Sequence, residues 1–287
     1  MIPYVLSPEE VVFKRPRPMI SYAQNAEDVL LRRVFGARSE GLYVDVGAYD
    51  PVFSSVSKHF YDLGWSGLNI DASPAACARV AAARPRDKTL NFGVSSRRGT
   101  MPFFEAPPGF AGLSTFVSGH AEKHRSRGVQ LQEISVEVRT LAELCEEHTS
   151  GPIDFMSIDV EGHEREVIEG ADFTRFRPRV LLVEAIEPLS TSPSYEQWEP
   201  LLYGEGYRFA AFDGLNRYYL PEELHADLAP RLAVPANVFD HFVPYEYWRQ
   251  IVELRGVVDR FQADERWLVK AARRVQALAR RARDAMR

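Results

Sequence analysis

The stretch LYVDVGAYD, residues 42–50, decides the fold because it joins a short apolar run to a glycine turn that carries acidic side chains. The run 42–46 matches a buried strand, and Gly47 marks the turn after it. Similar runs recur along the chain and alternate with helical patterns. This alternation predicts an α/β fold with a parallel sheet and helices on both of its faces. The other predicted strands are 67–71, 90–94, 153–159 and 179–184, and the predicted helices are 21–35, 54–63, 74–83 and a segment that ends at about Gly170.

Two further strands predict a hairpin near the end of the sheet. Residues 207–212 and 217–220 are apolar runs joined by Asp213-Gly214-Leu215-Asn216. An Asp-Gly pair between such runs is typical of a β-hairpin. We therefore expect the sheet to close with an antiparallel pair, which a nicotinamide-binding doubly wound domain does not require.

The segment from Gly99 to Gly151 is a long connection rich in Gly, Pro and Ser. Connections of this length and composition are usually functional. We expect a functional loop or lid here, in which Ser114 and Thr115 contact the substrate.

The composition is that of a globular protein without a membrane span. Hydrophobic residues make up 45% of the 287 residues and charged residues 26%, which excludes disorder of the whole chain. No apolar run approaches the ~18 residues of a transmembrane helix, and the start MIPYVLSPEE has neither the basic nor the apolar part of a secretory signal. The two cysteines, Cys77 and Cys145, are too few for a disulfide framework. We expect a cytoplasmic protein.

Charge divides the chain into an acidic body and a basic tail. Residues 270–287 contain one Lys, six Arg and one Asp, a net charge of +6, so the other residues carry −11 within a total of −5. Such a body is not typical of a nucleic-acid binder, and we expect no nucleic-acid partner. Three parts are predicted: an extended arm at 1–20, whose prolines oppose a helix, a domain at 21–245, and a basic amphipathic helix at 246–287.

The predicted C-terminal helix has two candidate partners. Its apolar residues recur at spacings of three and four, and arginines occupy much of the remaining surface. Such a helix fits the anionic inner face of a membrane as a peripheral contact, or it pairs with another helix and makes a homo-oligomer. Packing on its own body is a further alternative. The apolar residues are Leu268, Ala271, Ala272, Val275, Leu278, Ala279, Ala282 and Met286.

The first candidate site lies at the ends of the first two predicted strands, since ligands bind beyond the carboxyl ends of an open α/β sheet. Gly47 lets a ligand approach the backbone, and Asp45 offers a carboxylate; a turn with a buried capping Asp is the alternative. Asp71 follows Gly47 by 24 residues, close to the spacing at which nucleotide-binding folds hold a ribose. Its alternative is a helix cap, although Ser73 is better placed for one. The G-x-G-x-x-G pattern of dinucleotide sites is absent.

The second candidate site follows the predicted strand 153–159. Asp159, Glu161 and His163 lie within five residues. They could position an acceptor, with His163 or Asp159 as the base. Alternatively, Asp159, Glu161 and Glu184 could bind a divalent cation such as Mg or Mn. The helix dipole alone explains an acid at position 164.

Four motifs together resemble the FkbM family of S-adenosylmethionine-dependent methyltransferases. They are SYAQNAED (21–28), VDVGAYDP (44–51), SIDVEGHE (157–164) and LLVEAIEP (181–188). The later segments FDGLNRYYL (212–220) and PANVFDHFV (235–243) resemble a bacterial subgroup encoded beside glycosyltransferases. The resemblance implies a class I methyltransferase fold, a Rossmann-like sheet of seven strands with the last one antiparallel.

The resemblance also implies roles for individual residues. Asp45, Gly47 and Ala48 would hold the methionine part of the cofactor, and Asp71 with Ala72 its ribose. Asp159 and Glu161 match the motif after the fourth strand. Two departures stand out: 71–74 reads Asp-Ala-Ser-Pro where members more often have Glu-Pro, and 156–157 reads Met-Ser where many have Leu-Lys. The residues that match the entry motif near the cofactor pocket are Gln24, Glu27 and Asp28.

The resemblance implies an O-methyltransferase that uses S-adenosylmethionine, and we expect it to act on a sugar hydroxyl of a surface glycan, a glycolipid or a glycosylated metabolite. Aromatic residues, among them Tyr218, Tyr219, Phe110 and Phe116, are candidates for stacking on sugar faces. Two other hypotheses remain open. One is a non-catalytic methyltransferase-like partner subunit, and the other is an NAD(P)-dependent oxidoreductase.

Overall fold

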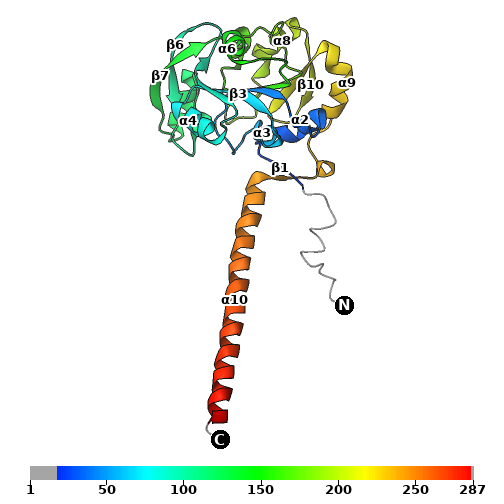
Figure 1. The fold of residues 1–287 in the computed structure, drawn as a ribbon. Helices are drawn as coiled ribbons and strands as arrows, with labels where there is room; N and C mark the ends of the chain where they lie inside the picture. The colour runs from blue at the N-terminus through cyan, green and yellow to red at the C-terminus, as the bar shows by residue number, and fades with distance from the viewer. Residues whose placement is uncertain (1–17, 286–287) are drawn as a thin grey trace. The chain divides into compact units, whose positions relative to one another are not determined.

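The computed structural model describes residues 18–285, so the predicted arm at 1–20 lies outside the described residues except for its last three. A mixed seven-stranded sheet forms the centre of the domain (Figure 1). Its strand order is β10-β11-β9-β8-β2-β3-β4, and β11 alone runs antiparallel to its two neighbours. This topology confirms the predicted class I methyltransferase sheet with its hairpin. The strands are β2 (Leu42–Val46), β3 (Ser66–Asp71), β4 (Lys88–Asn91), β8 (Phe155–Ile158), β9 (Val180–Glu184), β10 (Tyr207–Phe212) and β11 (Asn216–Pro221).

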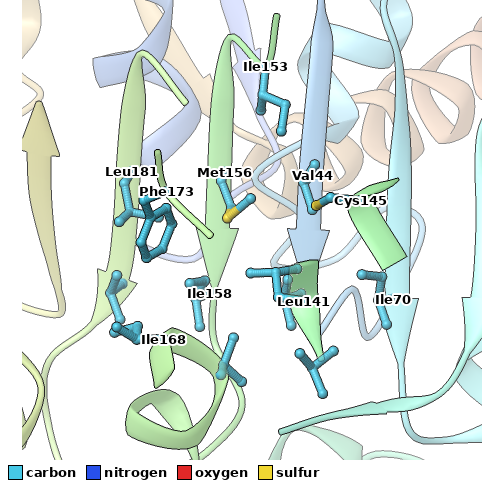
Figure 2. Packing of buried hydrophobic residues seen from close by; sticks show 14 of the residues in the cluster. Val44, Ile70, Leu141, Cys145, Ile153, Met156, Ile158, Ile168, Phe173 and Leu181 are labelled. Atoms are coloured by element: carbon cyan, nitrogen blue, oxygen red, sulfur yellow. The ribbon is translucent and has the colours of Figure 1, made fainter. Parts of the chain in front are cut away.

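Both faces of this sheet are buried, which explains why its central strands are nearly continuous apolar runs. Successive side chains alternate between two cores: Val44 joins one core, and Tyr43 joins the other. Figure 2 shows the first core, where Val44 and Met156 of neighbouring strands lie with Leu141 and Cys145 of α6 (Leu141–His148).

Helices cover each face. α6 and α7 contribute residues to the first core, and α2, α3 and α9 to the second, where α2 and α9 lie side by side (Figure 1). The helices of the domain are α2 (Glu27–Phe35), α3 (Lys58–Leu63), α4 (Pro74–Ala83), α5 (Ser118–Ser126), α6 (Leu141–His148), α7 (Glu164–Glu169), α8 (Glu199–Gly204) and α9 (Glu222–Leu232), with short 3-10 turns at Ala111–Leu113, Tyr195–Gln197 and Val238–Asp240.

The predicted loop or lid at 99–151 is mostly regular structure, so that expectation was wrong. β6 (Gly99–Glu105) and β7 (Gln132–Arg139) form an antiparallel pair, and β5 (Gly93–Val94) joins them in a second sheet. The predicted strand 90–94 accordingly divides between two sheets. The loop proper is confined to the residues around 106–117.

Two predicted helices begin later than their sequence patterns indicated. Buried Arg84 explains the late start of α3, because its guanidinium donates to the carbonyl of Pro51 and to the hydroxyls of Ser55 and Ser57. The segment before α3 is thereby held in a non-helical conformation. Before α2, the Asp28 carboxylate accepts a hydrogen bond from the amide of Tyr22.

The described chain divides into two units, one that ends at Phe242 and one that begins at Val243. The second unit consists mainly of α10 (Tyr245–Ala285). Short strands β1 (Met19–Ser21) and β12 (Phe242–Pro244) complete the element list. None of the helices within residues 18–285 has a stretch that is both long and apolar enough to cross a membrane.

Candidate functional site

A cavity of about 600 Å³ opens at the carboxyl ends of β2, β3, β8 and β9. This is where ligands bind in open α/β sheets, and the volume is within the usual range for small-molecule sites. The cavity combines acidic groups with apolar walls. Its carboxyl-bearing lining residues are Asp71, Asp159, Glu161, Glu184 and Glu187, and its aromatic ones include Tyr49, Phe92, Phe103, Phe110 and Phe116.

The turn after β2 packs directly against the turn after β8. Gly47 has φ +88°, and a Cβ added there would lie 1.7 Å from the carbonyl oxygen of Asp159. Only glycine allows both the left-handed backbone and this approach. Gly47 lines the cavity, whereas Asp45 and Ala48, predicted as cofactor contacts, are buried and do not.

Asp45 instead belongs to a buried polar network beneath the turn. Its carboxylate accepts a 2.6 Å hydrogen bond from Ser57, whose hydroxyl oxygen accepts one from Arg84. Burial raises the pKa of Asp45, while the Ser57 hydrogen bond and the Arg84 charge oppose that rise. The structure therefore supports a structural role for Asp45, the alternative weighed from the sequence.

Asp71 at the end of β3 faces the cavity, with Ala72 beside it. Its two carboxylate oxygens accept hydrogen bonds from the amides of Tyr49 at 2.8 Å and Ser73 at 2.7 Å. Burial raises the pKa of Asp71 to about 6, although both hydrogen bonds lower it. Each oxygen keeps a second lone pair for a ligand hydroxyl. The hydroxyl of Ser73 caps α4, so Asp71 is not needed for that role.

Three carboxyl groups meet on the opposite wall, from the turns after β8 and β9. Asp159 and Glu184 share a side-chain hydrogen bond, which lowers the pKa of Asp159 and raises that of Glu184. Burial is the larger effect and raises the pKa of both, and likewise that of Glu161. The shared bond therefore favours the ionised form of Asp159 over that of Glu184. Among residues 18–285, no group of three or more His, Cys, Asp or Glu side chains is arranged to hold a metal ion, so the predicted site at Asp159, Glu161 and Glu184 has no geometric support.

Glu161 is held in a strained conformation by the loop before α5. Its φ is +54°, which is unusual for a residue with a side chain. The carbonyl oxygen of Glu161 accepts from the hydroxyl of Thr115 at 2.8 Å and lies 3.2 Å from Nδ1 of His120. Thr115 does not line the cavity, although Ser114 does. Strain of this kind at a cavity is typical of functional sites.

His120 and Glu187 form part of the site that the sequence did not reveal. Nε2 of His120 lies 3.0 Å from Oε2 of Glu187, which lines the cavity. His120 lies 41 residues before Glu161 and 67 before Glu187, so no local motif could have joined them.

His163 and Glu164 lie behind the cavity wall. Nε2 of His163 is 3.2 Å from the hydroxyl of Ser95, and its ring packs 5.2 Å from that of Phe116. Burial lowers the pKa of His163, and nearby Glu166 raises it. His163 is not a lining residue, so the structure gives it no access to an acceptor as a base. The Glu164 carboxylate accepts hydrogen bonds from the backbone amides of residues 160 and 162.

The entry motif contributes one residue to the cavity, Gln24. Glu27 is buried behind it and accepts hydrogen bonds from the amide of Asn25 and the side chain of Asn216. Burial raises the pKa of Glu27 to about 8. Asp28 accepts from Ser21 at 2.6 Å. Glu27 and Asp28, predicted as cofactor contacts, thus shape the loop that carries Gln24.

Of the aromatic residues predicted to stack on a sugar, two are buried in the cores and two line the cavity. Tyr218 and Tyr219 of β11 are fully buried in the two cores, so the expectation that they stack on a sugar was wrong. Phe110 and Phe116 line the cavity.

The comparisons with known proteins identify the family. A family model described as "Methyltransferase FkbM domain" matches residues 45–209, more than half of the chain. The comparison with curated proteins gives no match.

Several solved structures with similar folds are methyltransferases. A TehB-like S-adenosylmethionine-dependent methyltransferase from Corynebacterium glutamicum is 8% identical, with 68% of this chain and 87% of that one covered and a TM-score of 0.40. An O-methyltransferase from Bacillus cereus in complex with S-adenosylhomocysteine is 10% identical, with 70% and 83% covered and a TM-score of 0.38. Precorrin-6y C5,15-methyltransferase from Geobacter metallireducens is 11% identical, with 71% and 98% covered and a TM-score of 0.40. On its sheet topology and the match over residues 45–209, the chain belongs to the FkbM family of S-adenosylmethionine-dependent methyltransferases.

Proposed function

We propose that this chain is an O-methyltransferase that methylates a sugar hydroxyl of a surface glycan, a glycolipid or a glycosylated metabolite. One observation carries the proposal: a single cavity presents Asp71 on one wall and the hydrogen-bonded carboxyl pair of Asp159 and Glu184 on another. The first wall suits a nucleoside, and the second suits a hydroxyl that must lose a proton.

The lining residues fit S-adenosylmethionine. Asp71 can accept hydrogen bonds from both ribose hydroxyls through its remaining lone pairs. Apolar residues such as Phe92 and Val94 line the same cavity and suit the adenine ring. Gly47 keeps the turn after β2 free of a side chain, next to the place where the rest of the cofactor would lie. When bound, the cofactor supplies a methyl group on a sulfonium.

Asp159 is the proposed base. S-adenosylmethionine would supply the methyl group, and the carboxylate of Asp159 would take up the proton that the acceptor hydroxyl loses. Proton transfer of this kind contributes about 10²–10⁴-fold to a rate. The hydrogen bond that Asp159 shares with Glu184 lowers the pKa of Asp159 and opposes the larger rise that burial causes.

The rest of the cavity supports a polyhydroxylated acceptor. Glu161 and Glu187 are further hydrogen-bond acceptors, and the rings of Phe103 and Phe116 pack 4.8 Å apart between their centroids. Carboxylates accept from several hydroxyls at once, and aromatic rings offer flat apolar surface. The two cysteines are free and buried, which supports a reducing, cytoplasmic setting for the reaction.

The cofactor part of the proposal is tested by calorimetric titration of Asp71→Ala with S-adenosylhomocysteine. Loss of two hydrogen bonds to a carboxylate should raise the Kd about 100-fold. Asp50→Ala is the matched control, because Asp50 accepts amides in the same turn but does not line the cavity. Equal affinities of the two variants, at equal unfolding midpoints, would exclude Asp71 from the cofactor site.

The acceptor part needs a separate assay. Transfer of a labelled methyl group is measured with a panel of hydroxyl-bearing glycans and their amine-bearing analogues. We expect labelling of the hydroxyl series, and it should fall by at least about 100-fold in Asp159→Asn. Labelling of the amine series alone would refute an O-methyltransferase.

A further inference from the structure

The first half of α10 has a regular apolar stripe. Tyr247, Ile251, Leu254, Val258 and Phe261 follow one another at spacings of four and three, and their exposed fractions range from 44% to 71%. We call these five residues the seam. This spacing is the heptad repeat of a coiled coil.

The seam is narrow and free of charge. At 3.6 residues per turn, its five residues lie within an arc of about 80°, which is typical of a coiled-coil contact and narrower than the face of a helix that packs on a globular core. Within residues 245–262 every charged residue falls outside the seam. Those charged residues are Glu246, Arg249, Glu253, Arg255, Asp259 and Arg260.

We infer that the seam binds the seam of a second copy of this chain, in a parallel two-stranded coiled coil. Ile251 and Val258 occupy one heptad position and are β-branched. The other position holds Leu254 at the centre of the seam, with Tyr247 and Phe261 at its ends. This distribution favours two parallel strands. α10 has 41 residues and is therefore about 60 Å long, enough for several heptads. A helix that exposes such a stripe gains its stability from a partner rather than from propensity alone.

The residues around the seam agree with this partner. Trp248 and Val257 flank it and would widen the apolar contact. On the opposite side, Arg249 and Glu253 lie 3.9 Å apart as a surface ion pair. Gly256 lies about 180° from the centre of the seam, where a helix-weakening residue is tolerated because no packing depends on it.

Charge argues against an anionic lipid surface as the partner of this half of the helix. Residues 245–262 carry three acidic and three basic side chains, so their net charge is zero. A polybasic segment gains about 1 kcal/mol per Lys or Arg near such a surface, but here the acidic residues cancel that attraction.

Sedimentation equilibrium of the full chain tests the inference. We expect twice the mass of the 32.6 kDa chain, and the dimer Kd should rise by at least about 100-fold in Ile251→Glu, because two charges would meet in the contact. Val252→Glu is the matched control. Val252 is also β-branched and equally exposed, at 45% against 44% for Ile251, but it lies about 100° further round the helix. We expect this variant to change the Kd by less than about threefold.

Two further measurements decide the partner and the orientation. Phe261→Cys should form a disulfide between copies, because the last seam position adjoins its own copy only in a parallel pair, and both native cysteines are buried. A monomeric chain, a dimer equally sensitive to both glutamate variants, or a monomer that sediments with phosphatidylserine vesicles would overturn the inference. Circular dichroism and the unfolding midpoint of each variant confirm that it is folded. The inference does not depend on the proposed function, since no seam residue lines the cavity.

Discussion

Replacement of Arg84 by methionine should destabilise the domain because the partners of this buried guanidinium would have no water to replace the lost hydrogen bonds. Arg84 is 1% exposed and donates four hydrogen bonds, two to the carbonyl of Pro51 and one each to Ser55 and Ser57. Ser57 in turn donates to the buried carboxylate of Asp45. Removing one partner of a buried charged network costs about 3–5 kcal/mol. For a domain of this size the unfolding midpoint should fall by about 10 °C.

The loss in Arg84→Met should depend on pH. Burial already raises the pKa of Asp45, and the Arg84 charge opposes that rise. Without Arg84, the native state holds the Asp45 proton more tightly than the unfolded state does. Stability then falls as pH rises above the unfolded pKa, so the difference from the native protein should be larger at about pH 7 than at about pH 4.

Urea denaturation at both pH values provides the assay, with Arg86→Met as the control. Arg86 is an exposed residue two positions away that donates to the carbonyl of Tyr61. Its replacement should cost less than about 1 kcal/mol. A loss below about 1 kcal/mol in Arg84→Met, or a loss that does not change with pH, would refute the network described for Asp45.

Three other predictions follow from the cavity wall. Gly47→Ala should prevent folding or lower the unfolding midpoint by more than about 10 °C, whereas Gly109→Ala, at φ +90° but with nothing within 4 Å, should cost only about 1 kcal/mol; equal losses would contradict the close approach to the carbonyl of Asp159. The pKa of Asp159 is raised to about 6, mainly by burial, so the initial rate of transfer should increase with pH through about 6, and a flat profile would exclude Asp159 as the base. Thr115→Val removes the hydrogen bond to the carbonyl of Glu161 and should slow transfer more than it weakens binding of S-adenosylhomocysteine; the reverse order would place Thr115 in the cofactor site.

The strands could be predicted from the sequence because a strand that is buried on both sheet faces is a nearly continuous run of apolar residues. The run 42–46 and the pair joined by Asp213-Gly214 are found as β2 and the β10–β11 hairpin. The first residues of the helices were harder to predict, because the residues that set them lie far away in the sequence. Arg84, which holds the segment before α3, lies 26 residues after the first residue of that helix.

The same distinction applies to the site. Parallel strands bring their carboxyl ends to one edge of the sheet, so residues at strand ends could be predicted to share a site. The four that line the cavity are Gly47, Asp71, Asp159 and Glu184. The local sequence does not determine whether a side chain at such an edge points into the cavity or away from it. Asp45 turns beneath the sheet edge toward Ser57 rather than into the cavity.

Long-range contacts account for what the sequence did not show. The second sheet pairs β6 with β7 across 26 intervening residues, from 106 to 131. This pairing brings His120 and Thr115 to the carbonyl of Glu161. A segment rich in Gly, Pro and Ser therefore contains a structured support for the site, which composition alone does not distinguish from a lid.

We expect the cavity at the ends of β2 and β3 to bind S-adenosylmethionine. Calorimetric titration of the purified full chain with S-adenosylhomocysteine, and with NAD as the control, measures this binding. We predict a Kd in the micromolar range, about −8 kcal/mol, for S-adenosylhomocysteine and no heat of binding for NAD. Binding of NAD alone, or of neither ligand by a folded chain, would contradict this expectation.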